Sequence, residues 1–180
     1  MADLPNTVAT DFAWYYEFIA AHVHKWVDPL TQEQFWHNPF TYGNSIGHLT
    51  LHLTGNLNYY IGARVAKTGY VRDRNREFTE TGKPDKARVL EAFDQTIAMV
   101  VSTVRKQKPE DWMAPYSASN EPPNIQHIYL IRRRFHVLTK FSQIFPVGPH
   151  RMWRNTPFDL KMPYKLVDIV FHPAYFTIFL

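Results

Sequence analysis

Residues 43–78 read GNSIGHLTLHLTGNLNYYIGARVAKTGYVRDRNREF, and this stretch does most to decide the fold. Apolar residues recur in its first part at three- and four-residue spacing, which predicts a helix with one buried face: Ile46, Leu49, Leu53, Leu57, Tyr60, Ile61 and Val65. Asn44 can cap the start of this helix, and Gly69 suits its end. The charged residues that follow predict a loop whose ion pairs are solvated.

Three further helices are expected around this one. Residues 7–27 have helical apolar spacing, and Thr31 with Gln34 fits a capping box for a short helix after it. A helix starting near Pro84 has an apolar stripe made of Val89, Leu90, Phe93, Ile97, Val100, Val101 and Val104. A last helix is expected over residues 124–145. Together they predict an all-α protein, folded as an antiparallel four-helix bundle.

The C-terminal residues differ in composition from this bundle. Five of the thirteen prolines lie after residue 145, so this segment cannot be one helix, and it is also rich in aromatic residues. We therefore predict a bundle over residues 1–145 and an irregular Pro- and aromatic-rich tail over residues 146–180. A disturbed reading frame near the last helix is one explanation of the change, and translating the other frames would test it.

Composition restricts the chemistry available to the chain. Its 180 residues are 45% hydrophobic and contain no cysteine, so a metal would need histidine, carboxylate or water ligands. The net charge of +4 is scattered except at residues 132–134, so we expect no nucleic-acid partner. No apolar run is long enough for a membrane span, and no basic-then-apolar leader is seen, so we expect no membrane partner and a cytoplasmic location.

Histidines supply the candidate site. His48 and His52 lie four residues apart, one helical turn, where neutral imidazoles can bind one metal ion; a pair without metal is the commoner meaning of this spacing alone. His136 on the last helix is the third candidate ligand, because a bundle brings facing helices together. Asn56 and Tyr60 could line a pocket beside it, although Tyr60 also suits the core.

The quoted stretch resembles the DinB/YfiT-like superfamily. The shared features are the helix carrying His-Leu-x-Gly-Asn and the downstream Arg-Asp-Arg-x-x-Glu-Phe. The resemblance implies a nickel or zinc ion held by three histidines, one on the second helix and two on the last. The family name refers to DNA-damage induction, which implies stress-related expression and not a DNA-binding surface.

Carried over residue by residue, the resemblance places the second-helix ligand at His52 and the first ligand of the last helix at His136. Lys140 stands where the third histidine is expected, and Gln143 matches the glutamine of the family pattern. A protonated lysine repels a divalent cation, so this departure would weaken a metal site.

The resemblance implies a metal-dependent enzyme acting on a small molecule, as a hydrolase or as a transferase using a low-molecular-weight thiol. A three-ligand metal site suits both, since it can lower the pKa of a bound water or thiol. The alternative is a bundle of the same fold without metal, serving as a small-molecule-binding or dimeric interaction protein. The abundance of aromatic residues also favours a homodimer.

Overall fold

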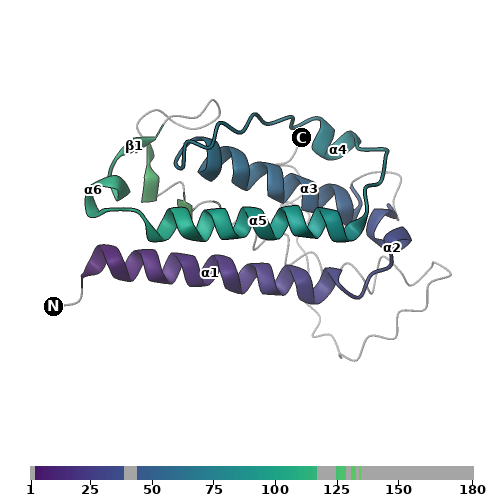
Figure 1. Cartoon of the computed structure of the whole chain (residues 1–180), viewed down its shortest axis with the longest axis horizontal. Helices are drawn as coiled ribbons and strands as arrows, with labels where there is room; N and C mark the ends of the chain where they lie inside the picture. The colour runs from purple at the N-terminus through teal and green to yellow at the C-terminus, as the bar shows by residue number, and fades with distance from the viewer. Residues whose placement is uncertain (1–2, 39–43, 117–124, 129–130, 133, 135–180) are drawn as a thin grey trace, which may run out of the picture.

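The computed structural model describes residues 3–38, 44–116, 125–128, 131–132 and 134. Within them the long helices are α1 (Leu4–Val27), α3 (Ile46–Leu57) and α5 (Lys86–Arg105), and a π-helix, η1 (Asn58–Ala63), continues α3 (Figure 1). The short elements are α2 (Gln32–Trp36), α4 (Arg76–Thr79), α6 (Pro109–Trp112), β1 (Pro115–Tyr116) and β2 (Ile125–Gln126). None of the helices described here has the length and apolarity to cross a bilayer.

The helix starts follow local capping chemistry. Both hydrogen bonds of the predicted Thr31–Gln34 capping box are present at α2, which confirms that expectation. At α3 the cap is Ser45 and not Asn44, because the Ser45 side chain accepts the hydrogen bond from the backbone N–H of His48. The chain turns π-helical at Asn58 and leaves the helix after Ala63, so the predicted end near Gly69 is too late.

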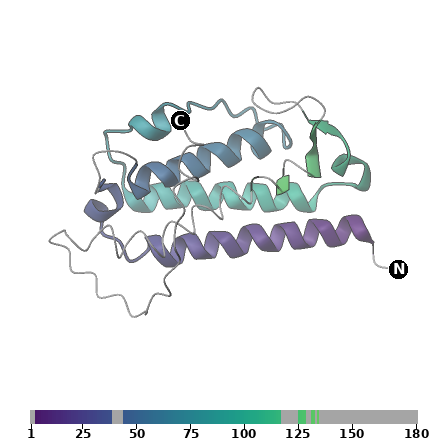
Figure 2. The same ribbon diagram turned by 180° about the vertical axis from the view of Figure 1, so that it is seen from behind.

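The long helices do not alternate strictly in direction. His24 near the end of α1 contacts Asp94 in the first half of α5, and Glu17, earlier in α1, contacts Arg105 at the end of α5, so these two helices are antiparallel. Asn58 of η1 contacts Thr96, and α3 and α5 run in the same direction, as Figures 1 and 2 show. Residues 64–85, which connect η1 to α5, run back along the length of the bundle. The described helices therefore depart from the fully antiparallel order that the sequence predicted, because that connection is long enough to cross the bundle.

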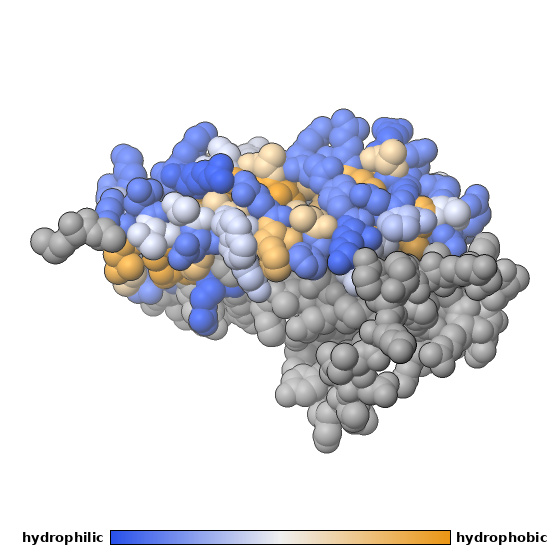
Figure 3. Space-filling view, turned by 90° about the horizontal axis from the view of Figure 1, so that it is seen from below, coloured by the Kyte–Doolittle hydropathy of each residue, from blue (hydrophilic) through white to orange (hydrophobic). Residues whose placement is uncertain are grey.

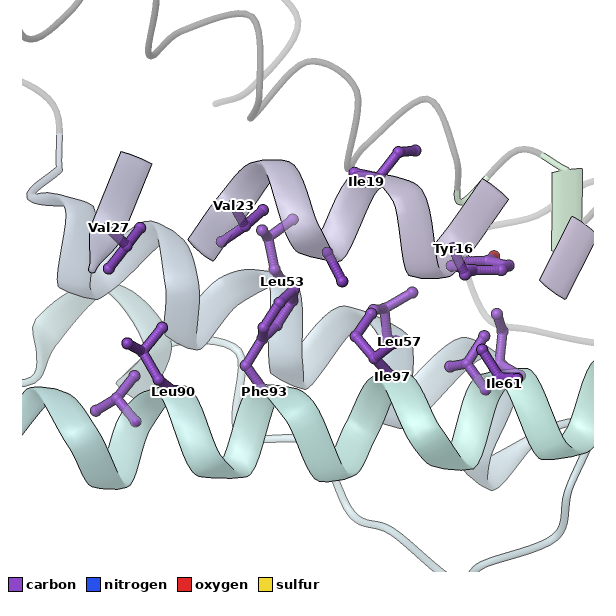
Figure 4. Close-up of a cluster of buried hydrophobic side chains, with 14 of the residues drawn as sticks. Tyr16, Ile19, Val23, Val27, Leu53, Leu57, Ile61, Leu90, Phe93 and Ile97 are labelled. Carbon is purple, nitrogen blue, oxygen red and sulfur yellow. The ribbon is translucent and has the colours of Figure 1, made fainter. Parts of the chain in front are cut away.

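The core lies between α1, α3 and α5. All seven residues of the predicted α5 stripe are buried, which confirms that part of the sequence analysis. Figure 4 shows side chains from the three helices meeting there, among them Val23, Leu53 and Phe93. Burial of such a continuous apolar face supplies most of the stability of helices of this length.

The predicted last helix falls mainly outside the described residues. Ile125 and Gln126 pair with β1 as a short strand, so a helix from residue 124 is wrong at its start. Ile131 is fully buried, and its carbonyl accepts a hydrogen bond of 2.9 Å from the buried Tyr16 hydroxyl. The predicted tail, residues 146–180, lies wholly outside the described residues.

A histidine joins α1 to α5 at the surface. The His24 ring contacts Asp28 through Nδ1 at 3.0 Å and Asp94 through Nε2 at 2.7 Å. Burial alone lowers the pKa of His24, but the hydrogen bonds to Asp94 and Asp28 outweigh it, and the net effect is a raised pKa. The charged ring therefore stabilises the fold below the unfolded pKa, and this contribution disappears as the pH rises through the folded pKa.

We expect His24→Gln to lower the free energy of unfolding by about 0.5 to 1 kcal/mol at pH 5.5, because the contact is largely solvent-exposed. Near pH 9 the loss should be smaller, since the wild-type ring is then neutral. Urea unfolding at the two pH values measures both. An equal loss for His24→Gln at both pH values would contradict the prediction.

Candidate functional site

His52 on α3 is held by a carboxylate from α4. Its Nδ1 lies 2.8 Å from Oε2 of Glu77, and the two side chains are 14% and 6% exposed. The Phe78 ring packs against the imidazole, with the ring centroids 4.8 Å apart. The imidazole is thus fixed on one edge by an acid and on one face by an aromatic ring.

Arg72 completes this cluster by neutralising the carboxylate. Its Nε donates to Oε1 of Glu77 at 2.6 Å and its Nη2 donates to Oε2 at 2.7 Å, a two-pronged arrangement that favours arginine over lysine. Burial by itself raises the pKa of Glu77, but the hydrogen bonds from His52 and Arg72 more than compensate, so the pKa is lowered. Glu77 is therefore an ionised acceptor at neutral pH.

An ionised carboxylate only accepts hydrogen bonds, so Nδ1 of His52 is the protonated nitrogen. Nη2 of Arg72 lies 3.2 Å from the same Nδ1, but its shorter bond goes to Glu77. In the neutral imidazole the lone pair is then on Nε2. One ring nitrogen is then held by a carboxylate, and the other keeps a lone pair that a metal ion can accept. Metal-ligating histidines usually have this arrangement.

The charged segment that supplies this acid differs from its sequence-based prediction, which was wrong here. A loop of solvated ion pairs was expected, whereas Glu77 and Arg72 are almost fully buried against α3. The reason is that His52 and Arg72 together satisfy the carboxylate, which makes burial of the charge tolerable. The signal available in the sequence was Arg72 placed five residues before Glu77, whose neighbour Phe78 is apolar and can pack on the bundle.

Gly55 gives Glu77 the room it needs on α3. A Cβ atom at this position would overlap Oε1 of Glu77 and lie 2.8 Å from its Cδ. The carboxylate cannot easily move aside, because His52 and Arg72 hold both of its oxygens. The glycine in the helix is therefore required by close approach of the buried acid.

We expect Gly55→Ala to lower the free energy of unfolding by about 1 to 3 kcal/mol, the usual cost of overpacking, although alanine is the better helix former. Thermal unfolding measures the change. Gly82→Ala is the matched control, because the added Cβ there would meet only the side chain of Glu80 near the surface. A stabilised Gly55→Ala variant would show that Glu77 is not fixed in this position.

His48 is engaged elsewhere. Its Nδ1 lies 2.8 Å from the Ser45 hydroxyl, and its Nε2 lies 2.9 Å from the Glu80 carbonyl oxygen. Both ring nitrogens therefore have partners, and the contact with Glu80 ties the start of α3 to the segment after α4. Its assignment as a candidate metal ligand stays a prediction, and ligation would require one of these hydrogen bonds to break.

The predicted pocket residues Asn56 and Tyr60 meet at a buried arginine. The Arg134 guanidinium lies 3.7 Å above the Tyr60 ring, and its Nη1 is 3.5 Å from Oδ1 of Asn56. Tyr60 and Arg134 are 7% and 5% exposed. Arg134, the last residue of the basic triplet 132–134, thus belongs to the interior.

The remaining predicted site residues, His136, Lys140 and Gln143, lie outside the described residues. In the part of the chain that the structure describes, no group of three or more His, Asp or Glu side chains could hold a metal ion. The described residues thus provide one imidazole with its supporting acid, which fits one ligand of a metal centre and is fewer than a stable three-ligand site needs.

The fold and the site define a helical protein built around a carboxylate-supported histidine on its second long helix. The family model described as the DinB superfamily matches residues 11–132, which include most of α1 and all of α3, α4 and α5. The chain therefore belongs to the DinB superfamily. No curated protein and no solved structure matches it.

Proposed function

We propose that this protein is a metal-dependent enzyme of the cytoplasm that acts on a small molecule, as a hydrolase or as a transferase using a low-molecular-weight thiol. His52 would be the first metal ligand and His136 the second, with nickel or zinc as the metal. The observation that carries the proposal is the 2.8 Å contact between Nδ1 of His52 and Glu77, which leaves the lone pair of Nε2 for a metal ion.

Three features support this choice over a purely structural ion pair. The cluster is almost fully buried, so His52, Glu77 and Arg72 are held in one geometry. Asn56 lies one turn further along α3 and is also buried. Family membership adds the expectation that the second-helix histidine binds metal.

A bound divalent metal would supply a Lewis acid to a water or a thiol. Glu77 and Arg72 would keep the His52 ring in one orientation and one tautomer, which preserves affinity for the ion. Asn56 would offer an amide for orienting a polar substrate, and Tyr60 an aromatic wall. Lys140 in place of a third histidine predicts weaker metal binding than a complete histidine site has.

Metal content tests the proposal directly. Protein purified without an affinity tag should contain nickel or zinc, and His52→Ala should lose it. His22→Ala is the matched control, since His22 lies on α1 and its Nδ1 contacts the backbone oxygen of Phe18. Retention of the metal by His52→Ala would reject the assigned ligand.

Two more variants refine the test. Glu77→Gln should reduce metal affinity by about ten-fold or more, since supporting acids of ligating histidines usually contribute that much. Lys140→His restores the histidine pattern of the family and should tighten metal binding. If it does not, His136 and Lys140 are not arranged around His52.

The second candidate is a metal-free small-molecule-binding or dimeric interaction protein. The observation favouring it is that both the histidine and the acid are already satisfied by each other and by Arg72. Wild-type protein without metal, unable to bind added nickel or zinc in calorimetry, would establish this alternative.

A further inference from the structure

The outward side of α1 presents large aromatic side chains. Trp14 and Phe18 are 58% and 43% exposed, and their rings stack with centroids 5.1 Å apart. Phe18 also packs on the His22 ring at 4.3 Å. Figure 3 views the molecule from the side of α1 and shows apolar side chains among the hydrophilic ones. Clustered exposed aromatic surface of this kind marks interaction sites.

Phe18 belongs to a heptad stripe on the helix, and Trp14 and His22 lie one turn to either side of it. Leu4, Asp11, Phe18 and Lys25 recur every seven residues, and all four are exposed. Because seven residues make almost two turns, the four side chains share one face. The core uses other residues of α1, namely Ala9, Ala13, Tyr16, Ile19, Ala20, Val23 and Val27.

The stripe is complementary to itself when one copy is reversed. Asp11 lies seven residues before Phe18, and Lys25 lies seven residues after it. If two α1 helices meet antiparallel with Phe18 facing Phe18, each Asp11 comes level with Lys25 of the other copy. Trp14 then comes level with His22 of the other copy, beside the exposed Ala21, whose small side chain leaves room for the indole.

We propose that two copies of this chain associate through α1, antiparallel, with Phe18 on the two-fold axis. We favour a second copy of this chain as the partner because the stripe carries both Asp11 and Lys25. In the antiparallel pair, each of these residues faces the oppositely charged one of the other copy. Two-fold interfaces place the same patch on both partners, so each favourable pair occurs twice. This inference is independent of the metal site, since the heptad residues lie on the side of α1 away from the core.

Sedimentation of the full chain at micromolar concentrations tests the dimer. The wild type should sediment as a dimer, and Phe18→Glu should sediment as a monomer, because two carboxylates would meet at the axis. Thermal unfolding followed by circular dichroism shows whether the variant is folded. Phe18→Ala, which introduces no charge, should give a weaker dimer and guards against a folding defect.

Charge reversal tests the antiparallel register. Asp11→Lys and Lys25→Asp should each weaken the dimer about ten-fold, because each creates two like-charge pairs. An equimolar mixture of the two variants should recover the dimer, since both pairs are complementary in the mixed species. A defect in folding or in α1 itself would not be rescued by mixing.

A wild type that stays monomeric at tens of micromolar overturns the proposal. So does a dimer that survives Phe18→Glu, which would place the contact on another face, or a mixture no better associated than its components. If the wild type is monomeric and Phe18→Glu increases protease cleavage within residues 135–180, that segment covers the stripe instead, and the dimer is rejected.

Discussion

Glu77→Gln should lower the free energy of unfolding by about 3 kcal/mol at pH 7, the usual cost of removing one partner from a buried ion pair. The buried Arg72 guanidinium would lose its counter-charge, and the new amide would place a donor near Nδ1 of His52 or the arginine. Urea unfolding measures the loss. Glu91→Gln, an exposed acid on α5, is the control and should change stability by less than about 0.5 kcal/mol.

The pH dependence of this effect follows from the lowered pKa of Glu77. A depressed folded pKa stabilises the protein above the unfolded pKa of about 4.3, and the contribution is lost as the pH falls through the folded pKa. The wild type should therefore approach the variant in stability below pH 4. A constant difference from pH 3 to pH 7 would contradict an ionised Glu77.

Arg72→Met should be destabilising by a similar amount, since it leaves the carboxylate as the unpaired buried charge. The double variant Arg72→Met/Glu77→Gln should lose less than the sum of the two single changes, because residues in one network are coupled. Additive losses would mean that the two side chains act separately.

Periodicity predicted the helices because one face of each helix is buried. The stripe from Val89 to Val104 is buried as expected, and the capping box at Thr31 marks the start of α2. The direction of α3 relative to α5 was not predictable in this way. It depends on how the 64–85 connection crosses the bundle, and periodicity within a helix carries no information about that path.

The site was predicted only in part. The spacing and the family resemblance both selected His52, which the structure places in a buried cluster. Glu77 and Arg72 were misread because charged residues between helices are usually solvated. Their burial requires His52, Arg72 and Glu77 to come together from separate segments, and it also requires the space left by Gly55. No local sequence pattern predicts such a meeting.

Phe93→Ala should lower the free energy of unfolding by about 3 to 5 kcal/mol, the range for truncating a buried phenylalanine. Phe93 is fully buried, and Figure 4 shows it pointing from α5 into the core where Val23 and Leu53 also lie. α1, α3 and α5 all line this region, so collapse into the cavity would require helices to shift. Thermal or urea unfolding gives the value.

Two control variants should be compared with Phe93→Ala. Val71→Ala removes methyl groups from a side chain that is 89% exposed, and should change stability by less than about 0.5 kcal/mol. Phe93→Leu keeps most of the buried volume and should lose clearly less than Phe93→Ala. Equal losses for the leucine and alanine variants would mean that ring shape, not buried volume, determines the cost.

Phe93→Ala also separates stability from the chemistry of His52. Its expected loss is at least as large as that of Glu77→Gln, yet it touches neither the imidazole nor its carboxylate. Below their unfolding transitions, the two variants should therefore differ in metal affinity, with Phe93→Ala near the wild type and Glu77→Gln reduced. If both lose metal equally, the effect of Glu77 is on the fold alone, and the carboxylate does not support a ligand.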